Sequence, residues 1–570
     1  MIICLRAIKS TLVWLLKPIV WITNFLYSEL QRSNGLSYVR RGYFLYNQGK
    51  QQEALKDFNH ALMLFQKIKN YKHEAMVLDE IGEFHSSCGE YAKALEHYQK
   101  SLTLYRKLGN RPLESRSLYC IGVIHFVLGN QSEALQHSHH ALIVQRELGD
   151  RISEGKTLTN LAKVYEEMGQ TKQALELLQE ALQIAREQRN LKLESTVINN
   201  LGSFYSGLSQ YSKALEFHRQ ALELYIKNRD TAGQGVSLNN IGQIHRELRQ
   251  YPQAMKLFKE ALEIFKQVGN RAREATALNN IGSVYDQQGW YQDSLNYYQE
   301  ALPICREVGD RSGEATTLNN IGVVHWFLGD YSTALEYYLE SFALYQQIGD
   351  LSSQATSLNN MGDIYRRWGA FTNAVESFQQ ALVIASKVGA RNTEATVLVN
   401  LGFVYDNLED LNKALTYHQL ALAACQDIGA KSGQASALYG IGRIYLKLAS
   451  YSEADNFLRQ SLAINQELGE RSNQSDTLNE LGLLYKALKE YDKALEHCQE
   501  SLRLRKQLGN KIAEIESIES IGTIFYQQEK YSQSLEYYQE ALAISRELKD
   551  WDVEDRLIKA IEEINRHLSI

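Results

Sequence analysis

Histidine and cysteine are the side chains of this 570-residue sequence best suited to metal binding or catalysis. The six cysteines form no C-x-x-C pair and no Cys/His spacing typical of a zinc site. His137, His139 and His140 are the densest cluster, but no flanking carboxylate completes a metal site. The sequence also lacks a phosphate-binding glycine loop, a G-x-S-x-G elbow and an H-E-x-x-H motif. We therefore expect no catalytic residue, no metal and no cofactor.

Asparagine is the second residue type of interest, because it recurs at a fixed interval and its side-chain amide can form hydrogen bonds. One column contains Asn199, Asn239, Asn279, Asn319 and Asn359, and the adjacent column contains Asn160, Asn200, Asn240, Asn280, Asn320, Asn360 and Asn400. Asparagine is unfavourable in the middle of a helix, so local propensity does not explain these columns. Each amide has a donor and an acceptor, which suits the backbone of an extended peptide. A ladder of hydrogen bonds between neighbouring repeats is the alternative, and both interpretations stay open at this point.

The interval of 40 residues extends along almost the whole chain. Thirteen units fill residues 31–550 without insertion or deletion, and twelve of them have glycine at the position of Gly282. Only 4 prolines interrupt the chain, where average usage would give about 28. A fixed period of this length indicates one repeat array rather than several unrelated domains.

One unit, residues 271–310, shows what the repeat encodes. Apolar residues recur at helical spacing in two stretches, separated at Gly289 and closed by Gly309 and Asp310. Glycine suits the left-handed position after a helix, and aspartate caps the next helix. Glycine at Gly282, in the middle of the first helix, costs about 1 kcal/mol relative to alanine and therefore indicates close helix packing. The sequence predicts an all-α stack of helical hairpins.

The repeated motif resembles a known family. Ile281-Gly282-x-x-Tyr285, followed by a small residue and an aromatic residue as in Ala334-x-x-x-Tyr338, resembles the tetratricopeptide repeat (TPR) pattern. The 40-residue period and the Asn-Asn-x-Gly run are similar to the arrays of Pins/LGN-like adaptors, kinesin light chains and bacterial TPR regulators. The resemblance implies a right-handed α-solenoid whose first helices line an inner groove. It also implies that the asparagines hold the backbone of a bound peptide.

The face of the first helices opposite the apolar stripe carries the predicted peptide-binding residues. They are Asn199, Asn239, Asn279, Asn319, Asn359, Trp326, Phe327, Arg366, Arg367, Phe403, Arg443 and Lys447. Aromatic residues beside arginine are typical of binding hot spots, and ordinary groove lining is the alternative. Five positions of this face carry a summed charge of −2, and the chain carries −6. Such a face is no basic channel, so we expect no nucleic-acid partner.

The two ends of the chain lie outside the repeats. Residues 1–30 contain two apolar runs divided at Lys17 and Pro18, each shorter than a membrane span. Two interpretations stay open for this segment: membrane contact that leaves the array cytoplasmic, or a degenerate capping helix. Residues 551–570 predict a C-terminal capping helix, apolar along one face at Leu557 and Ile564.

These features together predict a non-enzymatic, cytoplasmic scaffold or adaptor. Its expected ligand is an extended peptide or a partner protein, bound in the inner groove. A membrane-anchored assembly factor and a regulatory sensor subunit for a separate effector enzyme are the alternatives. The sequence indicates neither the identity of the partner nor the oligomeric state.

Overall fold

The computed structural model describes residues 27–46, 50–548 and 551–568, and every regular element in these ranges is an α-helix. The apolar runs of the N-terminal segment, and with them its two interpretations, lie outside the described residues. Within the described ranges, no helix combines the length and the apolar character that crossing a membrane requires.

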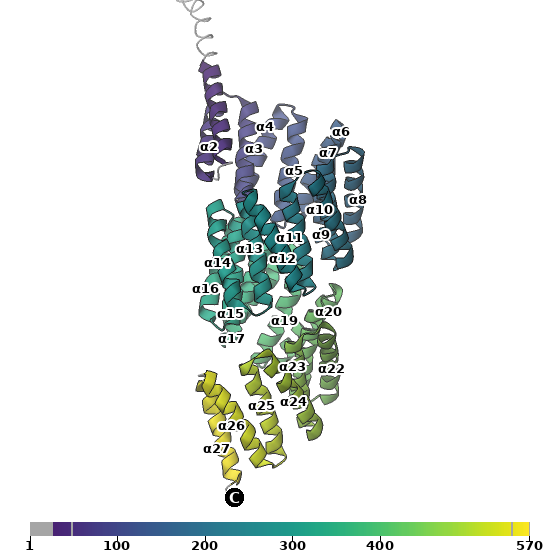
Figure 1. Ribbon diagram of the computed structural model, residues 1–570, viewed down its shortest axis with the longest axis vertical. Coiled ribbons are helices and arrows are strands. Elements are labelled where there is room, and N and C mark those ends of the chain that lie inside the picture. Colours follow the sequence, from purple (N-terminus) through teal and green to yellow (C-terminus); the bar gives the residue numbers. More distant parts are fainter. Residues whose placement is uncertain (1–26, 47–49, 549–550, 569–570) are drawn as a thin grey trace, which may run out of the picture. The chain divides into compact units, whose positions relative to one another are not determined.

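In the described ranges, the helices form thirteen consecutive hairpins and a final helix (Figure 1). The first helices are residues 27–46, α3 (Tyr71–Ser87), α5 (Arg111–Val127), α7 (Arg151–Glu167), α9 (Leu191–Gly207), α11 (Thr231–Glu247), α13 (Arg271–Gln287), α15 (Arg311–Phe327), α17 (Leu351–Arg367), α19 (Arg391–Asn407), α21 (Lys431–Lys447), α23 (Arg471–Ala487) and α25 (Lys511–Gln527). The second helices are α2 (Gln51–Lys67), α4 (Tyr91–Lys107), α6 (Gln131–Leu148), α8 (Thr171–Glu187), α10 (Tyr211–Lys227), α12 (Tyr251–Gln267), α14 (Tyr291–Val308), α16 (Tyr331–Ile348), α18 (Phe371–Val388), α20 (Leu411–Asp427), α22 (Tyr451–Leu468), α24 (Tyr491–Leu508) and α26 (Tyr531–Leu548). The predicted all-α solenoid of 40-residue hairpins is confirmed.

The turn after α14 shows how the sequence ends one helix and begins the next. Gly309 follows the last helical residue with φ 69°, in the left-handed region. Asp310 then caps α15, because its side chain accepts a hydrogen bond from the backbone N–H of Gly313 at 2.8 Å. Both expectations for the end of the unit are confirmed.

The regular spacing of glycine within the first helices reflects a close contact between the two helices of a hairpin. A Cβ atom added at Gly282 would lie 2.7 Å from Cε1 of Tyr298, a side chain that is 1% exposed. The same contact recurs at Gly242, where the added atom would lie 2.8 Å from Cε1 of Phe258. Glycine is therefore needed for the first helix to approach the aromatic residue of the second helix.

A second contact stacks two rings in most hairpins. The rings of Tyr285 and Tyr297 lie 5.5 Å apart and nearly parallel. In the second and third hairpins, histidines take both places, as in the pair His125 and His137 at 5.5 Å. These histidines therefore act as packing residues. In the described part of the chain, no group of histidine, cysteine and carboxylate side chains is arranged to hold a metal ion.

Contacts between residues divide the chain into two compact units, residues 1–357 and 358–570, and the division falls within α17. The first unit contains a contact between hairpins far apart in sequence: Tyr91 of α4 packs against the cluster that includes Ala315 of α15 and Tyr345 of α16. In the second unit, α27 (Trp551–Leu568) packs on the last hairpin and buries Leu557 and Ile564. This helix caps the array, as the sequence predicts.

The close contact at Gly282 generates the first prediction. Gly282→Leu places a branched side chain against the buried ring of Tyr298, and we expect a loss of about 1–3 kcal/mol of stability. The control is Gln292→Leu, because Gln292 is exposed on α14 of the same hairpin. Denaturant unfolding followed by circular dichroism measures both variants. Equal unfolding midpoints would show that the glycine position tolerates a large side chain.

Candidate functional site

Three of the predicted asparagines accept a hydrogen bond from an asparagine of the next first helix. Oδ1 of Asn239 accepts from Nδ2 of Asn280 at 2.8 Å, and Oδ1 of Asn359 accepts from Nδ2 of Asn400 at 2.9 Å. Oδ1 of Asn199 accepts from Asn240 at 3.3 Å. In each pair, the donor lies in the next repeat, 41 positions later. These three amides therefore join one repeat to the next, and their contact with a peptide stays a prediction.

Asn199 has two further polar contacts, one within its own hairpin and one with the next first helix. Its Oδ1 lies 2.9 Å from Nδ1 of His218 and 3.4 Å from Oγ of Ser237. Burial lowers the pKa of His218 to about 4, so this ring is neutral at physiological pH. A neutral ring with its proton on Nδ1 donates to the amide, and the Asn199 side chain is thus held by donors from three residues.

Asn279 departs from this arrangement. Its Nδ2 donates to Oγ1 of Thr317 at 2.8 Å, in the next first helix, but its buried Oδ1 has no hydrogen-bond partner. Asn319 occupies the equivalent position on α15 and is half-buried. Asn279 thus has an open acceptor, unlike Asn199, Asn239 and Asn359.

A cavity of about 550 Å³ lies beside Asn279 in the first unit. Its lining comes mainly from α13 and α15 and comprises Tyr91, Arg246, Thr276, Asn279, Asn280, Ser283, Asp310, Ser312, Gly313, Thr316 and Asn320. Amides and hydroxyls dominate this lining, and its two charged residues, Arg246 and Asp310, are of opposite sign. The cavity is therefore polar but carries no net charge.

The predicted aromatic anchors lie together at the end of α15. The ring of Phe327 contacts Trp326 edge to face at 4.8 Å and stacks on Tyr291 of the preceding hairpin at 5.5 Å. Phe327 remains 51% exposed. An exposed ring that neighbouring rings hold in place is suited to contact a ligand at little cost in conformational entropy.

The predicted cationic residues of the second unit are all engaged by carboxylates. Arg366 contacts Asp363 at 2.5 Å, and Arg367 contacts it at 3.2 Å. Burial raises the pKa of Asp363, but the two guanidinium groups outweigh it and hold this pKa below its ordinary value. Arg443 and Lys447 share Asp406, at 3.4 and 2.5 Å.

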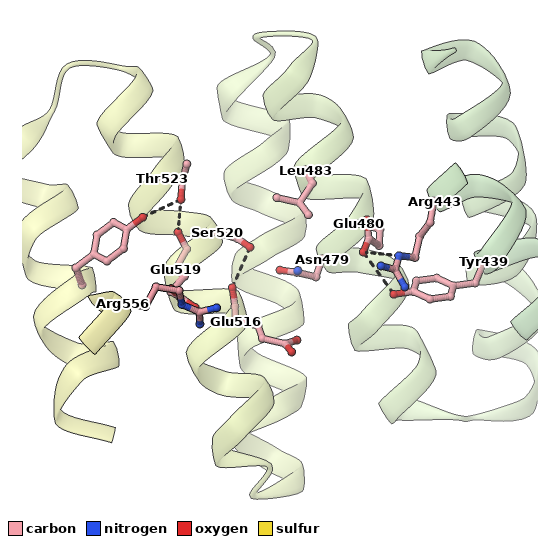
Figure 2. A pocket seen from close by; sticks show the side chains of 11 residues that line it. Tyr439, Arg443, Asn479, Glu480, Leu483, Glu516, Glu519, Ser520, Thr523 and Arg556 are labelled. Atoms are coloured by element: carbon pink, nitrogen blue, oxygen red, sulfur yellow. Dashed lines mark hydrogen bonds and ion pairs between the residues drawn. The ribbon is translucent and has the colours of Figure 1, made fainter. Parts of the chain in front are cut away.

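Arg443 also borders a second cavity, of about 450 Å³, in the second unit (Figure 2). The residues that line it are Tyr439, Arg443, Asn479, Glu480, Leu483, Glu516, Glu519, Ser520, Thr523, Tyr538 and Arg556. Phe403 contacts Tyr439, with ring centroids 6.2 Å apart. The sequence prediction did not include the three glutamates of this lining. Glu516 and Glu519 give α25 an excess of negative charge, and this excess was the signal that could have indicated them.

Comparison with known proteins identifies the repeat. A sequence model described as tetratricopeptide repeat matches nine windows: residues 35–107, 74–137, 113–187, 193–267, 233–307, 273–347, 313–387, 393–467 and 473–547. No curated protein matches the chain.

Several solved structures are similar to parts of the chain. BtubC (BKLC) from P. vanneervenii is 22% identical with a TM-score of 0.32, covering 39% of this chain and 91% of that chain. The apo form of RapI is 19% identical with a TM-score of 0.38, covering 49% and 99%. A Rap protein complexed with competence and sporulation factor is 18% identical with a TM-score of 0.44, covering 63% and 99%.

A half-buried carboxylate on α13 generates the second prediction. Oδ1 of Asp286 has no hydrogen-bond partner, and burial raises the pKa of Asp286 to about 6. Between about pH 4 and 6 the folded chain keeps a proton here that the unfolded chain has released, so stability is lost as pH rises through this window. Asp286→Asn removes this titration. We expect the variant to exceed the wild type in stability by up to about 2–3 kcal/mol near pH 7, and to match it near pH 4.

Unfolding midpoints measured at the two pH values check this expectation. Asp293→Asn is the control, because Asp293 is exposed at the start of α14. A stability difference between Asp286→Asn and the wild type that does not change with pH would show that the folded and unfolded chains bind this proton equally.

Proposed function

The chain belongs to the tetratricopeptide repeat family, and from this premise we propose that it is a scaffold that binds an extended peptide segment on the faces of its first helices. The segment belongs either to a peptide or to a partner protein. Arrays of this repeat typically act as non-enzymatic interaction scaffolds. Membership of the family names neither the surface that binds nor the group that is recognised. For this chain we propose the faces of the first helices as the surface and the backbone of the ligand as the recognised group.

The observation that carries the proposal is the polar cavity beside Asn279. The backbone of an extended segment presents N–H donors and C=O acceptors along its length, with no charge. The cavity offers amides and hydroxyls, its two charges are of opposite sign, and Oδ1 of Asn279 is an acceptor without a partner. A backbone N–H of the ligand supplies the missing donor, which relieves the cost of leaving a buried oxygen unsatisfied.

The aromatic pair on the same helix supplies the apolar part of the surface. Phe327 is exposed and Trp326 supports it, so together they offer area that a ligand side chain buries. Asn319 and Trp326 belong to the first unit, whereas Asn359, Arg366 and Arg367 belong to the second. Contact of one segment with all five remains a prediction.

Peptide selection with the full chain tests the proposal. We expect a display library of random peptides to yield binders, and Asn279→Ala to weaken them about tenfold, as the loss of a buried hydrogen bond does. Asn296→Ala is the matched control, because Asn296 is exposed on the second helix of the same hairpin. Fluorescence anisotropy with a labelled binder measures both affinities. Trp326→Ala should weaken binding by about 2 kcal/mol or more.

Modification of the ligand tests whether its backbone is recognised. Methylation of single backbone nitrogens of the selected peptide should weaken binding at one or two positions, since it removes the donor without changing the side chain. Replacing its side chains with alanine at those positions should have little effect. If Asn279→Ala and Asn296→Ala bind the peptide as the wild type does, the ligand does not use this face.

A further inference from the structure

The cavity of the second unit differs in chemistry from the one beside Asn279. Three of the side chains that line it are glutamates, Glu480, Glu516 and Glu519, and two are arginines, Arg443 and Arg556. They come from the first helices α21, α23 and α25 and from the capping helix α27 (Figure 2). The lining therefore carries one net negative charge in a space of about 450 Å³.

Both arginines of the lining are already bound by carboxylates. Nε of Arg443 lies 3.2 Å from Glu480, and its Nη2 lies 3.4 Å from Asp406. Nη2 of Arg556 donates to Glu519 at 2.8 Å. An anionic ligand would have to compete with these carboxylates and would meet Glu516 as well. The lining is thus unsuited to a phosphate or a carboxylate.

The glutamates, in contrast, retain capacity to accept hydrogen bonds. A carboxylate has about four lone-pair sites, and Glu519 uses one of its oxygens for Arg556. The side chain of Glu516 is 60% exposed and contacts Arg505 at 3.3 Å with one oxygen. Burial raises the pKa of Glu480 and of Glu519, which shows that their arginine partners do not fully compensate their desolvation.

Asn479 provides an independent sign that a donor belongs in this cavity. Asn479 is only 7% exposed, it lines the cavity, and its Oδ1 has no hydrogen-bond partner. Figure 2 shows its amide between Glu480 and the helix that carries Glu516 and Ser520. A buried amide oxygen without a donor is unfavourable unless a ligand or water satisfies it. The oxygen and the neighbouring carboxylates require the same thing, a group that donates several hydrogen bonds.

We propose that this cavity binds a basic side chain of the partner segment, with arginine preferred over lysine. The proposal rests on the proposed function, because the side chain arrives as part of a bound peptide. A guanidinium has five N–H donors in a fixed plane and is more weakly hydrated than an ammonium, so it loses less on entering a partly buried site. Oδ1 of Asn479 and the carboxylates of Glu480 and Glu519 accept its donors. The ring of Tyr538, which also lines the cavity, gives the cation an aromatic neighbour.

Peptide selection in parallel on full-length chains tests the proposal. The wild type is compared with Glu519→Gln, which keeps the shape and removes a charge. Glu496→Gln is the control, since Glu496 is exposed on α24 and does not line the cavity. We expect arginine to be enriched in peptides selected by the wild type and by Glu496→Gln, but not in those selected by Glu519→Gln. Asn479→Leu should have the same effect, and circular dichroism melts show that each variant is folded.

Affinity measurements on one arginine-containing binder complete the test. Replacing its arginine with citrulline, the uncharged isostere, should weaken binding to the wild type about tenfold or more. The same replacement should change binding to Glu519→Gln much less. Lysine in place of arginine should give an intermediate affinity.

The possible failures are distinguishable. If the wild type selects no peptide, the proposed function fails, and this inference fails with it. If it selects peptides without enriched arginine or lysine, or if citrulline is tolerated, the inference is wrong and the proposed function stands. Titration with spermidine and with N-acetylarginine amide separates the two sources of positive charge. Tight binding of spermidine without binding of the arginine amide would assign the cavity to a free polyamine and overturn the proposal.

Discussion

The close approach of the two helices within each hairpin is the constraint on which the rest of the structure depends. At Gly282 there is no room for a Cβ atom against the ring of Tyr298, and a close contact between a glycine and a side chain of the second helix recurs at every equivalent position except Ala162. This contact fixes how each first helix lies on its partner, and so which of its faces is buried. The opposite faces of neighbouring first helices are then oriented alike, which aligns the asparagine columns. The surface that we propose for binding therefore follows from a packing contact on the other side of the helix.

The aligned faces are used in two ways. Where both asparagine columns are complete, as at Asn239 and Asn280, the amides bind each other and hold the repeats together. Two places differ from this arrangement. Asn279 and Asn320 are both present, yet the amide of Asn279 donates to Thr317 and its oxygen has no partner. In the last repeats, glutamates replace asparagines around Asn479. The ligand recognition that we propose and the observed hydrogen bonds between repeats thus involve the same positions.

The sequence predicted well what depends on one hairpin and its immediate neighbour. The period, the apolar stripes, the turn at Gly309 and the role of Gly282 follow from spacing and local conformation, and the structure confirms them. The surroundings of the candidate site were harder to predict from the sequence, because they depend on which of several nearby groups each side chain binds. Arg366 is bound by Asp363, one turn earlier on its own helix, and the acceptor of Asn279 is open although that of Asn239 is filled. Side chains of the same type at equivalent positions differ in these choices, so counting residue types along a face cannot separate them.

The packing of Tyr91 against the cluster that includes Ala315 and Tyr345 changes how the first unit is held together. An array in which each hairpin contacts only the next is a linear chain of couplings, and it loses structure progressively from its ends. A contact between hairpins more than two hundred residues apart adds a closed loop to that chain. Unfolding of α4 then removes a packing contact of α15 and α16 directly, whether or not the hairpins between them remain folded. The same contact places Tyr91 at the wall of the cavity beside Asn279, so occupation of that cavity and the cohesion of distant repeats share a side chain.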